Sequence, residues 1–203
     1  MDMSKKKKII IPVAIGLGLL MAGFAYLMQI RGEFKDYLSE KYPGQTFQVG
    51  FVKIDPIYGS YFTTVSCLDD NVSFPIGKSF RTKNINESYL QTKSHNQYNA
   101  YIKEVFNESG IKSHITSVTG GGRDKEHYQN DGHYDQINLY LTEEAELIYI
   151  TQAALNLLRE KGIQADTVIL TQEKDGHVYE WYGSTADYDL TEDQLREKIR
   201  KIK

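Results

Sequence analysis

The sequence is poor in cysteine and proline, with one cysteine and four prolines among 203 residues. Cys67 is the only cysteine, so no disulfide can form within the chain and the fold must depend on packing. A lipid-modified cysteine at the N-terminal end is excluded as well, because Cys67 lies far from that end. Cys67 shares a face with Val65 in the alternating stretch 61–68, which predicts a buried thiol.

Positive charge is scarce beyond the N-terminus. Once Lys5–Lys8, Arg31 and Asp2 are set aside, 19 Lys and Arg face 26 Asp and Glu, a formal charge of −7. Nucleic-acid binding depends on neutralising phosphates, so a polynucleotide partner is excluded. The chain also lacks a serine nucleophile elbow, the HExxH zinc motif and a phosphate-binding loop with its Gly-Lys-Ser or Gly-Lys-Thr end. We therefore predict a non-catalytic binding or interaction protein that needs no cofactor.

A long apolar run stands at the N-terminal end. Residues Ile9–Ile30 follow the basic cluster Lys5–Lys8, and 22 residues at about 1.5 Å each give about 33 Å of helix, enough for a bilayer core of about 30 Å. This pattern predicts a single transmembrane helix at residues 9–30 in the plasma membrane. The basic tail, residues 1–8, is then cytoplasmic and the C-terminal part extracytoplasmic. A signal peptide cleaved after Gly23 and Ala25 is the alternative.

The apolar run indicates two kinds of partner. As a membrane helix, Ile9–Ile30 would contact the lipid bilayer. Ala14, Gly18 and Ala22 recur every fourth residue, a spacing with which two helices could pair closely in a homodimer. The remaining chain would bind another envelope protein or a wall component. Tyrosine-rich faces can serve such a role, although most of the fifteen tyrosines lie at helix or strand spacings that suit a core. The stretches 58–61 and 179–182 are the candidates for exposed rings.

Beyond residue 30 the pattern predicts an α+β fold with two small units of antiparallel sheet and packed helices, at residues 31–122 and 133–203. The polar stretch from Gly120 to Gly132 gives the boundary. The expected helices are 34–41, 87–107, a helix capped by Thr142 that ends near Gly162, and a last one with a Thr191–Gln194 capping box. The expected strands are 46–54, 61–68, 72–80, 113–118, 134–141, 166–172 and 177–181.

The order of several segments resembles that of a known family. The segments are Tyr37–Phe47, Asp55–Gly59, Cys67–Asn71 and Ser117–Gly122. They resemble the YfjL-like proteins, small membrane-anchored or lipid-anchored envelope proteins of Gram-positive bacteria, over most of the chain after the apolar run. The resemblance implies an N-terminal and a C-terminal YfjL-like unit with no established activity, and it carries no catalytic residues.

One polar stretch, residues 123–135, contains groups that could bind a metal. His127, Asp131, His133 and Asp135 combine imidazole with carboxylate, which suits zinc or manganese. The spacing matches no standard structural zinc or calcium motif, so a solvated linker is the first interpretation. The alternative is a metal-dependent envelope hydrolase that uses the loop from His127 to Asp135.

Overall fold

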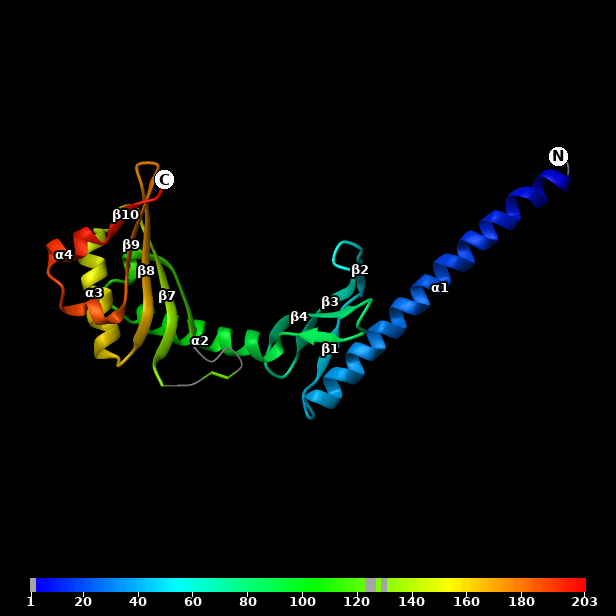
Figure 1. Ribbon diagram of the computed structural model, residues 1–203, viewed down its shortest axis with the longest axis horizontal. Coiled ribbons are helices and arrows are strands. Elements are labelled where there is room, and N and C mark those ends of the chain that lie inside the picture. The colour runs from blue at the N-terminus through cyan, green and yellow to red at the C-terminus, as the bar shows by residue number, and fades with distance from the viewer. Residues whose placement is uncertain (1–2, 123–126, 129–130) are drawn as a thin grey trace. The chain divides into compact units, whose positions relative to one another are not determined.

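The structure, a computed structural model, describes residues 3–122, 127–128 and 131–203, and of residues 3–15 only the backbone. The chain divides into two compact units, Met1–Tyr89 and Leu90–Lys203, called unit 1 and unit 2 below (Figure 1). Each unit combines a β-sheet with helices, so the predicted α+β class is confirmed. The boundary lies at Tyr89, the first residue of α2, and not in the predicted stretch from Gly120 to Gly132.

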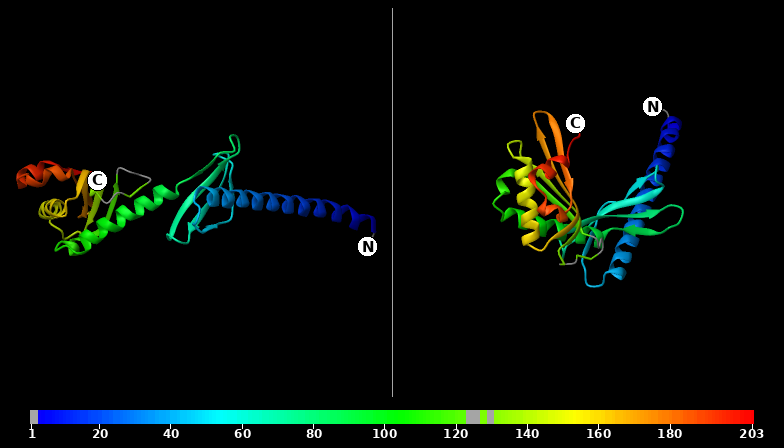
Figure 2. Two further views of the ribbon diagram at one scale, coloured as in Figure 1. Left: turned by 90° about the horizontal axis from the view of Figure 1, so that it is seen from below. Right: turned by 60° about the vertical axis from the view of Figure 1, so that its left-hand side comes forward.

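Unit 1 consists of one long helix and a small antiparallel sheet. Helix α1 spans Met3–Lys41, and the sheet has the strand order β1-β3-β4-β5, with β2 also paired to β3. The strands are β1 (Phe47–Val49), β2 (Lys53–Asp55), β3 (Ser60–Cys67), β4 (Val72–Ser79) and β5 (Ile85–Glu87). The N-terminal part of α1 extends beyond this sheet, as the two views of Figure 2 also show.

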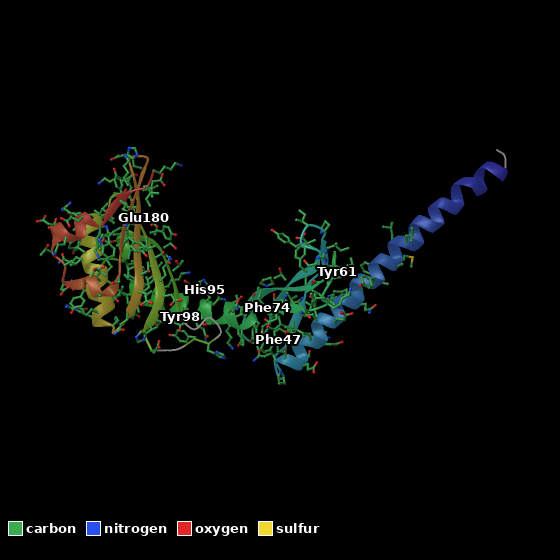
Figure 3. All side chains as sticks on the ribbon, viewed as in Figure 1. Phe47, Tyr61, Phe74, His95, Tyr98 and Glu180 are labelled. Atoms are coloured by element: carbon green, nitrogen blue, oxygen red, sulfur yellow. The ribbon has the colours of Figure 1, made fainter. Side chains whose placement is uncertain are left out.

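The C-terminal half of α1 forms part of the core of unit 1. Ile30, Phe34 and Leu38 recur every fourth residue along one face of α1 and are at most 1% exposed. Burying each such side chain stabilises the unit by about 1.5–3 kcal/mol. On the sheet side they join Val65 and Phe74 among the buried side chains. Phe47 lies against Phe74, with ring centroids 6.0 Å apart (Figure 3).

The apolar run ends at Ile30, whereas helix α1 continues to Lys41. Ile30 is buried in the protein core, and Tyr26 packs edge-on against Tyr61 at 5.8 Å between ring centroids. Among the residues that the structure describes, no helix combines the length and apolar character needed to cross a bilayer. This finding contradicts the predicted transmembrane helix Ile9–Ile30. It also contradicts the predicted single-pass placement in the plasma membrane, with a cytoplasmic N-terminus and an extracytoplasmic C-terminal part.

Unit 2 is built on a second sheet, with strand order β10-β9-β8-β7-β6. Helix α2 (Tyr89–Asn107) precedes β6 (Ile115–Gly122) and β7 (His133–Leu141), and α3 (Leu147–Glu160) connects β7 to β8 (Gln164–Lys174). Strand β9 (His177–Gly183), α4 (Glu192–Glu197) and β10 (Ile199–Lys201) complete the unit. Short 3₁₀ turns lie at Lys112–His114 and Thr185–Asp189.

The sheet of unit 2 is not purely antiparallel as predicted. Strands β7 and β8 run parallel, with Ile137 beside Val168 and Leu139 beside Leu170. Parallel neighbouring strands need a crossover connection, and α3 provides it. The apolar side of α3 packs on the sheet. The buried side of α3 includes Ile150, Ala154 and Leu158, and it shares one core with α2 and the strands.

Two predicted helix ends differ from the structure. Helix α3 begins at Leu147 and not after Thr142, because the loop before it is held in place by Gln172. The Gln172 amide lies within hydrogen-bond distance of the carbonyls of Thr142, Glu143 and Ala145, at 3.0, 3.1 and 2.6 Å. The Thr191–Gln194 capping box is confirmed, but α4 stops at Glu197 and Ile199 instead pairs with Trp181 in the sheet.

A carboxylate at the end of β5 joins α1 to the sheet of unit 1. Glu87 accepts hydrogen bonds from Lys41 Nζ and Tyr42 OH, both at 2.7 Å, and from the Tyr89 N–H at 2.5 Å. Burial acts to raise the pKa of Glu87, but the hydrogen bonds from Lys41, Tyr89 and Tyr42 outweigh it and lower the pKa below 4.5. Burial, followed by the bond to Glu87, raises the pKa of Tyr42 to about 12.

Because the folded-state pKa of Glu87 is lowered, its stabilising effect exists above the unfolded pKa of 4.5 and is lost as the pH falls through the folded value. We expect Glu87→Gln to lower the free energy of unfolding at pH 7 by about 1 kcal/mol, since Lys41 is half exposed and its charge is screened. The variant should also lose less stability than the wild type between pH 5 and pH 3. Thermal melts across this pH range measure both effects. Glu40→Gln, an exposed neighbour on α1, is the control, and equal pH profiles for Glu87→Gln and the wild type would contradict this role.

Candidate functional site

The residues predicted as metal ligands do not converge. Asp131 and His133 pair with each other, with Asp131 Oδ2 3.4 Å from His133 Nδ1 and Asp131 Oδ1 accepting the His133 N–H at 3.0 Å. Asp135 instead lines a cavity between α2 and the strands β6 and β7. Among the described residues, which include His127, no three His, Cys, Asp or Glu side chains gather as metal ligands would. The geometry therefore gives no support to a metal site in this loop.

The cavity that contains Asp135 lies within unit 2. It has a volume of about 280 Å³, just below the usual range for ligand pockets, which starts near 300 Å³. His95 and Tyr98, which are one turn apart on α2 (Figure 3), are both among its lining residues. Its lining residues are Gln91, Ser94, His95, Tyr98, Gly121, Gly122, Asp135 and Gln136. A β-bulge lies at this wall, because the register of β6 on β7 passes from Gly121–Gln136 to Gly122–Tyr134 and so steps over Asp135.

Close packing explains two of the three consecutive glycines. A Cβ on Gly120 would lie 2.8 Å from the Tyr134 ring, and a Cβ on Gly122 would overlap the Tyr98 ring. These two rings pack edge-on at 5.2 Å between centroids, and Tyr134 OH donates to the Tyr98 carbonyl at 3.2 Å. Burial raises the pKa of Tyr134 well above its usual range, so this hydroxyl is a neutral donor. Gly120 and Gly122 are thus part of the core, and all three glycines belong to strand β6 and not to a phosphate-binding loop.

The side of the unit 2 sheet away from α2 and α3 is lined by polar and tyrosine side chains. In the register, Tyr140 lies beside Thr171, and Thr171 beside Glu180. Tyr182 is half exposed, and the Arg200 guanidinium lies 5.9 Å from its ring. Antiparallel sheets commonly have one such solvated face. Of the candidate stretch 179–182, Tyr182 is thus exposed and Tyr179 only partly so.

Unit 1 exposes apolar side chains of a different kind. Within the described part of the chain, the large hydrophobic side chains that unit 2 exposes are tyrosines and Ile202. Most of those that unit 1 exposes are aliphatic or phenylalanine. Leu19 and Leu20 are 71% and 73% exposed, and Met21 and Phe24 are also exposed. We call residues 16–26 of α1 the apolar segment. Its exposed side chains point in every direction around the helix, a pattern typical of helices that a partner surrounds.

The turn between β2 and β3 adds two further apolar side chains. Asp55 Oδ1 accepts the N–H groups of Ile57 and Tyr58 at 2.9 and 3.0 Å, which fixes the turn. Ile57 and Tyr58 are 88% and 84% exposed at its tip. Of the candidate stretch 58–61, Tyr58 is thus exposed and Tyr61 only partly so.

A groove runs between α1 and strand β1 in unit 1. Its volume is about 530 Å³. Arg31 reaches across its floor, with Nε and Nη2 donating to the Val49 carbonyl at 3.0 and 2.8 Å. The lining residues are Met28, Arg31, Gly32, Lys35, Phe47, Gln48, Val49 and Leu68.

Cys67 is buried and 1% exposed, as predicted. Its thiol donates to Gln45 Oε1 at 3.2 Å and lies 3.6 Å from Tyr89 OH. Tyr89 OH in turn donates to the Asp70 carboxylate, and burial followed by this bond raises the pKa of Tyr89. Cys67 therefore serves packing at the base of the sheet and is remote from solvent.

Comparison with known proteins gives no relative from which a function could be transferred. The chain matches no protein-family model, no curated protein and no solved structure. The resemblance to the YfjL-like proteins is not tested by this result and stays a prediction.

Sequence reasoning missed the groove between α1 and β1. The predicted strand 46–54 merges β1 with most of β2, so the short edge strand was not recognised as one wall of a groove. The available indication was Gly32, a glycine within a helical pattern next to Arg31 and Lys35. Clustering pointed to Tyr58 and Tyr182 among the exposed tyrosines, but not to Tyr140 or Tyr149.

The packing of the glycines gives a test in unit 2. We expect Gly122→Ala to lower the free energy of unfolding by about 1–3 kcal/mol, because the added methyl group overlaps the Tyr98 ring. Gly121→Ala is the matched control, since its Cβ would meet only His95 Nδ1 at 3.9 Å. Urea unfolding followed by the fluorescence of Trp181, the only tryptophan and fully buried in unit 2, measures both variants. If Gly122→Ala is as stable as Gly121→Ala, the close packing is contradicted.

Proposed function

We propose that the chain is a non-catalytic interaction protein that acts through unit 1. The observation that carries this proposal is the apolar segment of α1. Soluble monomers rarely expose a continuous apolar surface of this kind unless a partner covers it. The described residues offer no comparable argument for catalysis, because the candidate ligands Asp131, His133 and Asp135 do not gather around one point.

The partner that fits the apolar segment best is a second copy of the same segment. Its exposed side chains surround the helix, so the side of closest contact must be marked by another feature, the row of small residues. Gly18 and Ala22 are exposed one turn apart, and no other described atom lies within 4 Å of a Cβ built on Gly18. Two helices can approach closely along such small residues. Ala14, the third member of the predicted stripe, lies outside the described side chains.

Unit 1 presents the segment in a defined direction. Phe34 and Leu38 hold the C-terminal half of α1 in the core, and the Glu33–Lys78 ion pair and the Arg31–Val49 hydrogen bonds fix its rotation on the sheet. A rigid support lowers the entropy lost on association. A pair of such helices would carry two copies of unit 2, whose exposed sheet face with Tyr140 and Tyr182 would then be presented twice.

Gly18→Ile tests the pairing. We expect the substitution to lower the association constant of the full chain about tenfold, about 1.4 kcal/mol, because the side chain separates the two helices. Crosslinking of the full chain over a range of concentrations gives the dimer fraction. Gly23→Ile is the matched control, since Gly23 also has open space within the described structure but lies on another face of α1.

Three outcomes would contradict the proposal. Equal dimer fractions for Gly18→Ile and Gly23→Ile would remove the helix pairing. A chain that stays monomeric and sediments with phosphatidylcholine vesicles would show that lipid covers the segment. Turnover of a substrate by the purified chain, abolished by a substitution of His133 or Asp135, would favour the hydrolase alternative.

A further inference from the structure

The main chain of strand β1 is open toward the groove. The Leu68 N–H donates to the Thr46 carbonyl at 2.9 Å, and the Gly50 N–H donates to the Thr64 carbonyl at 3.0 Å. Successive residues of a strand direct their main-chain groups to opposite sides, so residues 46, 48 and 50 bind β3. Phe47 and Val49 therefore direct their N–H and carbonyl groups away from β3. The bonds from Arg31 to the Val49 carbonyl agree with this direction.

Such an edge can take up a further extended chain. Phe47 offers both a donor and an acceptor, and Val49 offers its N–H, in the spacing of a β-ladder. The groove beside them is wide enough for side chains, at about 530 Å³. Its apolar lining comes from Met28, Phe47, Val49 and Leu68. An extended peptide would thus find hydrogen bonds along its backbone and an apolar wall for one of its side chains.

The charge of the groove selects among peptides. Arg31 and Lys35 stand one turn apart on α1 and both line it. The guanidinium has five N–H donors, and the two nitrogens that bind Val49 leave donors for a second acceptor. A carboxylate is the group that matches a guanidinium and an ammonium side by side. Asp69, which follows the lining residue Leu68 in the chain, accepts the Thr46 N–H.

Gly32 keeps the groove open. It lies within helix α1, where glycine is less favourable than alanine by about 1 kcal/mol. No other described atom lies within 4 Å of a Cβ built there, and its φ is not in the left-handed region. Neither packing within unit 1 nor backbone conformation therefore requires a glycine at this position. If another chain approached α1 closely at this position, a glycine would be required there.

We propose that the groove between α1 and β1 binds an extended acidic peptide segment of another protein. The peptide adds a strand beside Phe47 and Val49, passes over Gly32, and places a carboxylate at Arg31 and Lys35. This site is separate from the pairing of the apolar segments, so either proposal can fail without the other.

A displayed library of random seven-residue peptides, selected on the immobilised full chain at low ionic strength, tests the proposal. We expect enrichment of peptides that carry Asp or Glu next to β-branched residues. Gly32→Leu should lower the affinity of the selected peptides at least about tenfold by filling the groove. Gly23→Leu, the same change at another open position of α1, should leave that affinity unchanged.

The peptides themselves provide the test of charge. Replacing their Glu by Gln should weaken binding about threefold to tenfold and remove most of its dependence on salt. Lys35→Gln should have a similar effect on the acidic peptide and none on the Gln form. Selection of peptides without acids, or equal affinity for Gly32→Leu and the wild type, would overturn the proposal. A lower dimer fraction in Gly32→Leu would also overturn it, because a second copy would then occupy the groove.

Discussion

The packing of the C-terminal half of α1 on the sheet of unit 1 is the contact on which the other features of that unit depend. Ile30, Phe34 and Leu38 are almost fully buried, so this half of the helix belongs to the core. The same contact sets the position of Arg31 at Val49, defines the groove, and leaves the apolar segment exposed beyond the sheet (Figure 1). A free helix with this sequence would have neither a groove nor a fixed direction.

Local patterns were sufficient to predict most individual elements. Alternation along 61–68 and 72–80 predicted β3 and β4, and the Thr191–Gln194 capping box predicted the start of α4. Cys67 was correctly assigned to the core from its place in that alternation. These predictions succeed because the turn residues and the hydrophobic period that determine such elements lie within a few residues of one another in the sequence.

Features set by contacts distant in sequence could not be predicted in this way. The loop before α3 is held by Gln172, and the parallel pairing of β7 with β8 depends on how α3 packs. The polar stretch from Gly120 to Gly132 indicates a boundary in the sequence, although its first three residues belong to β6, which pairs with β7 within one sheet. The apolar run was interpreted as a complete membrane span because the sequence does not show that Ile30 is buried in protein. For the candidate site, the sequence indicated two stretches whose tyrosines Tyr58 and Tyr182 are exposed. The groove, in contrast, can be recognised only once the register of β1 on β3 is known.

Amide hydrogen exchange of the full chain, followed by mass spectrometry, tests most directly whether α1 is part of the core of unit 1. If the helix and the sheet form one cooperative structure, the amides of residues 31–41 will exchange at the same slow rate as those of β3 and β4. Rapid exchange of residues 31–41 while β3 and β4 stay protected would show that the sheet is stable without the helix, and the packing described above would then be contradicted.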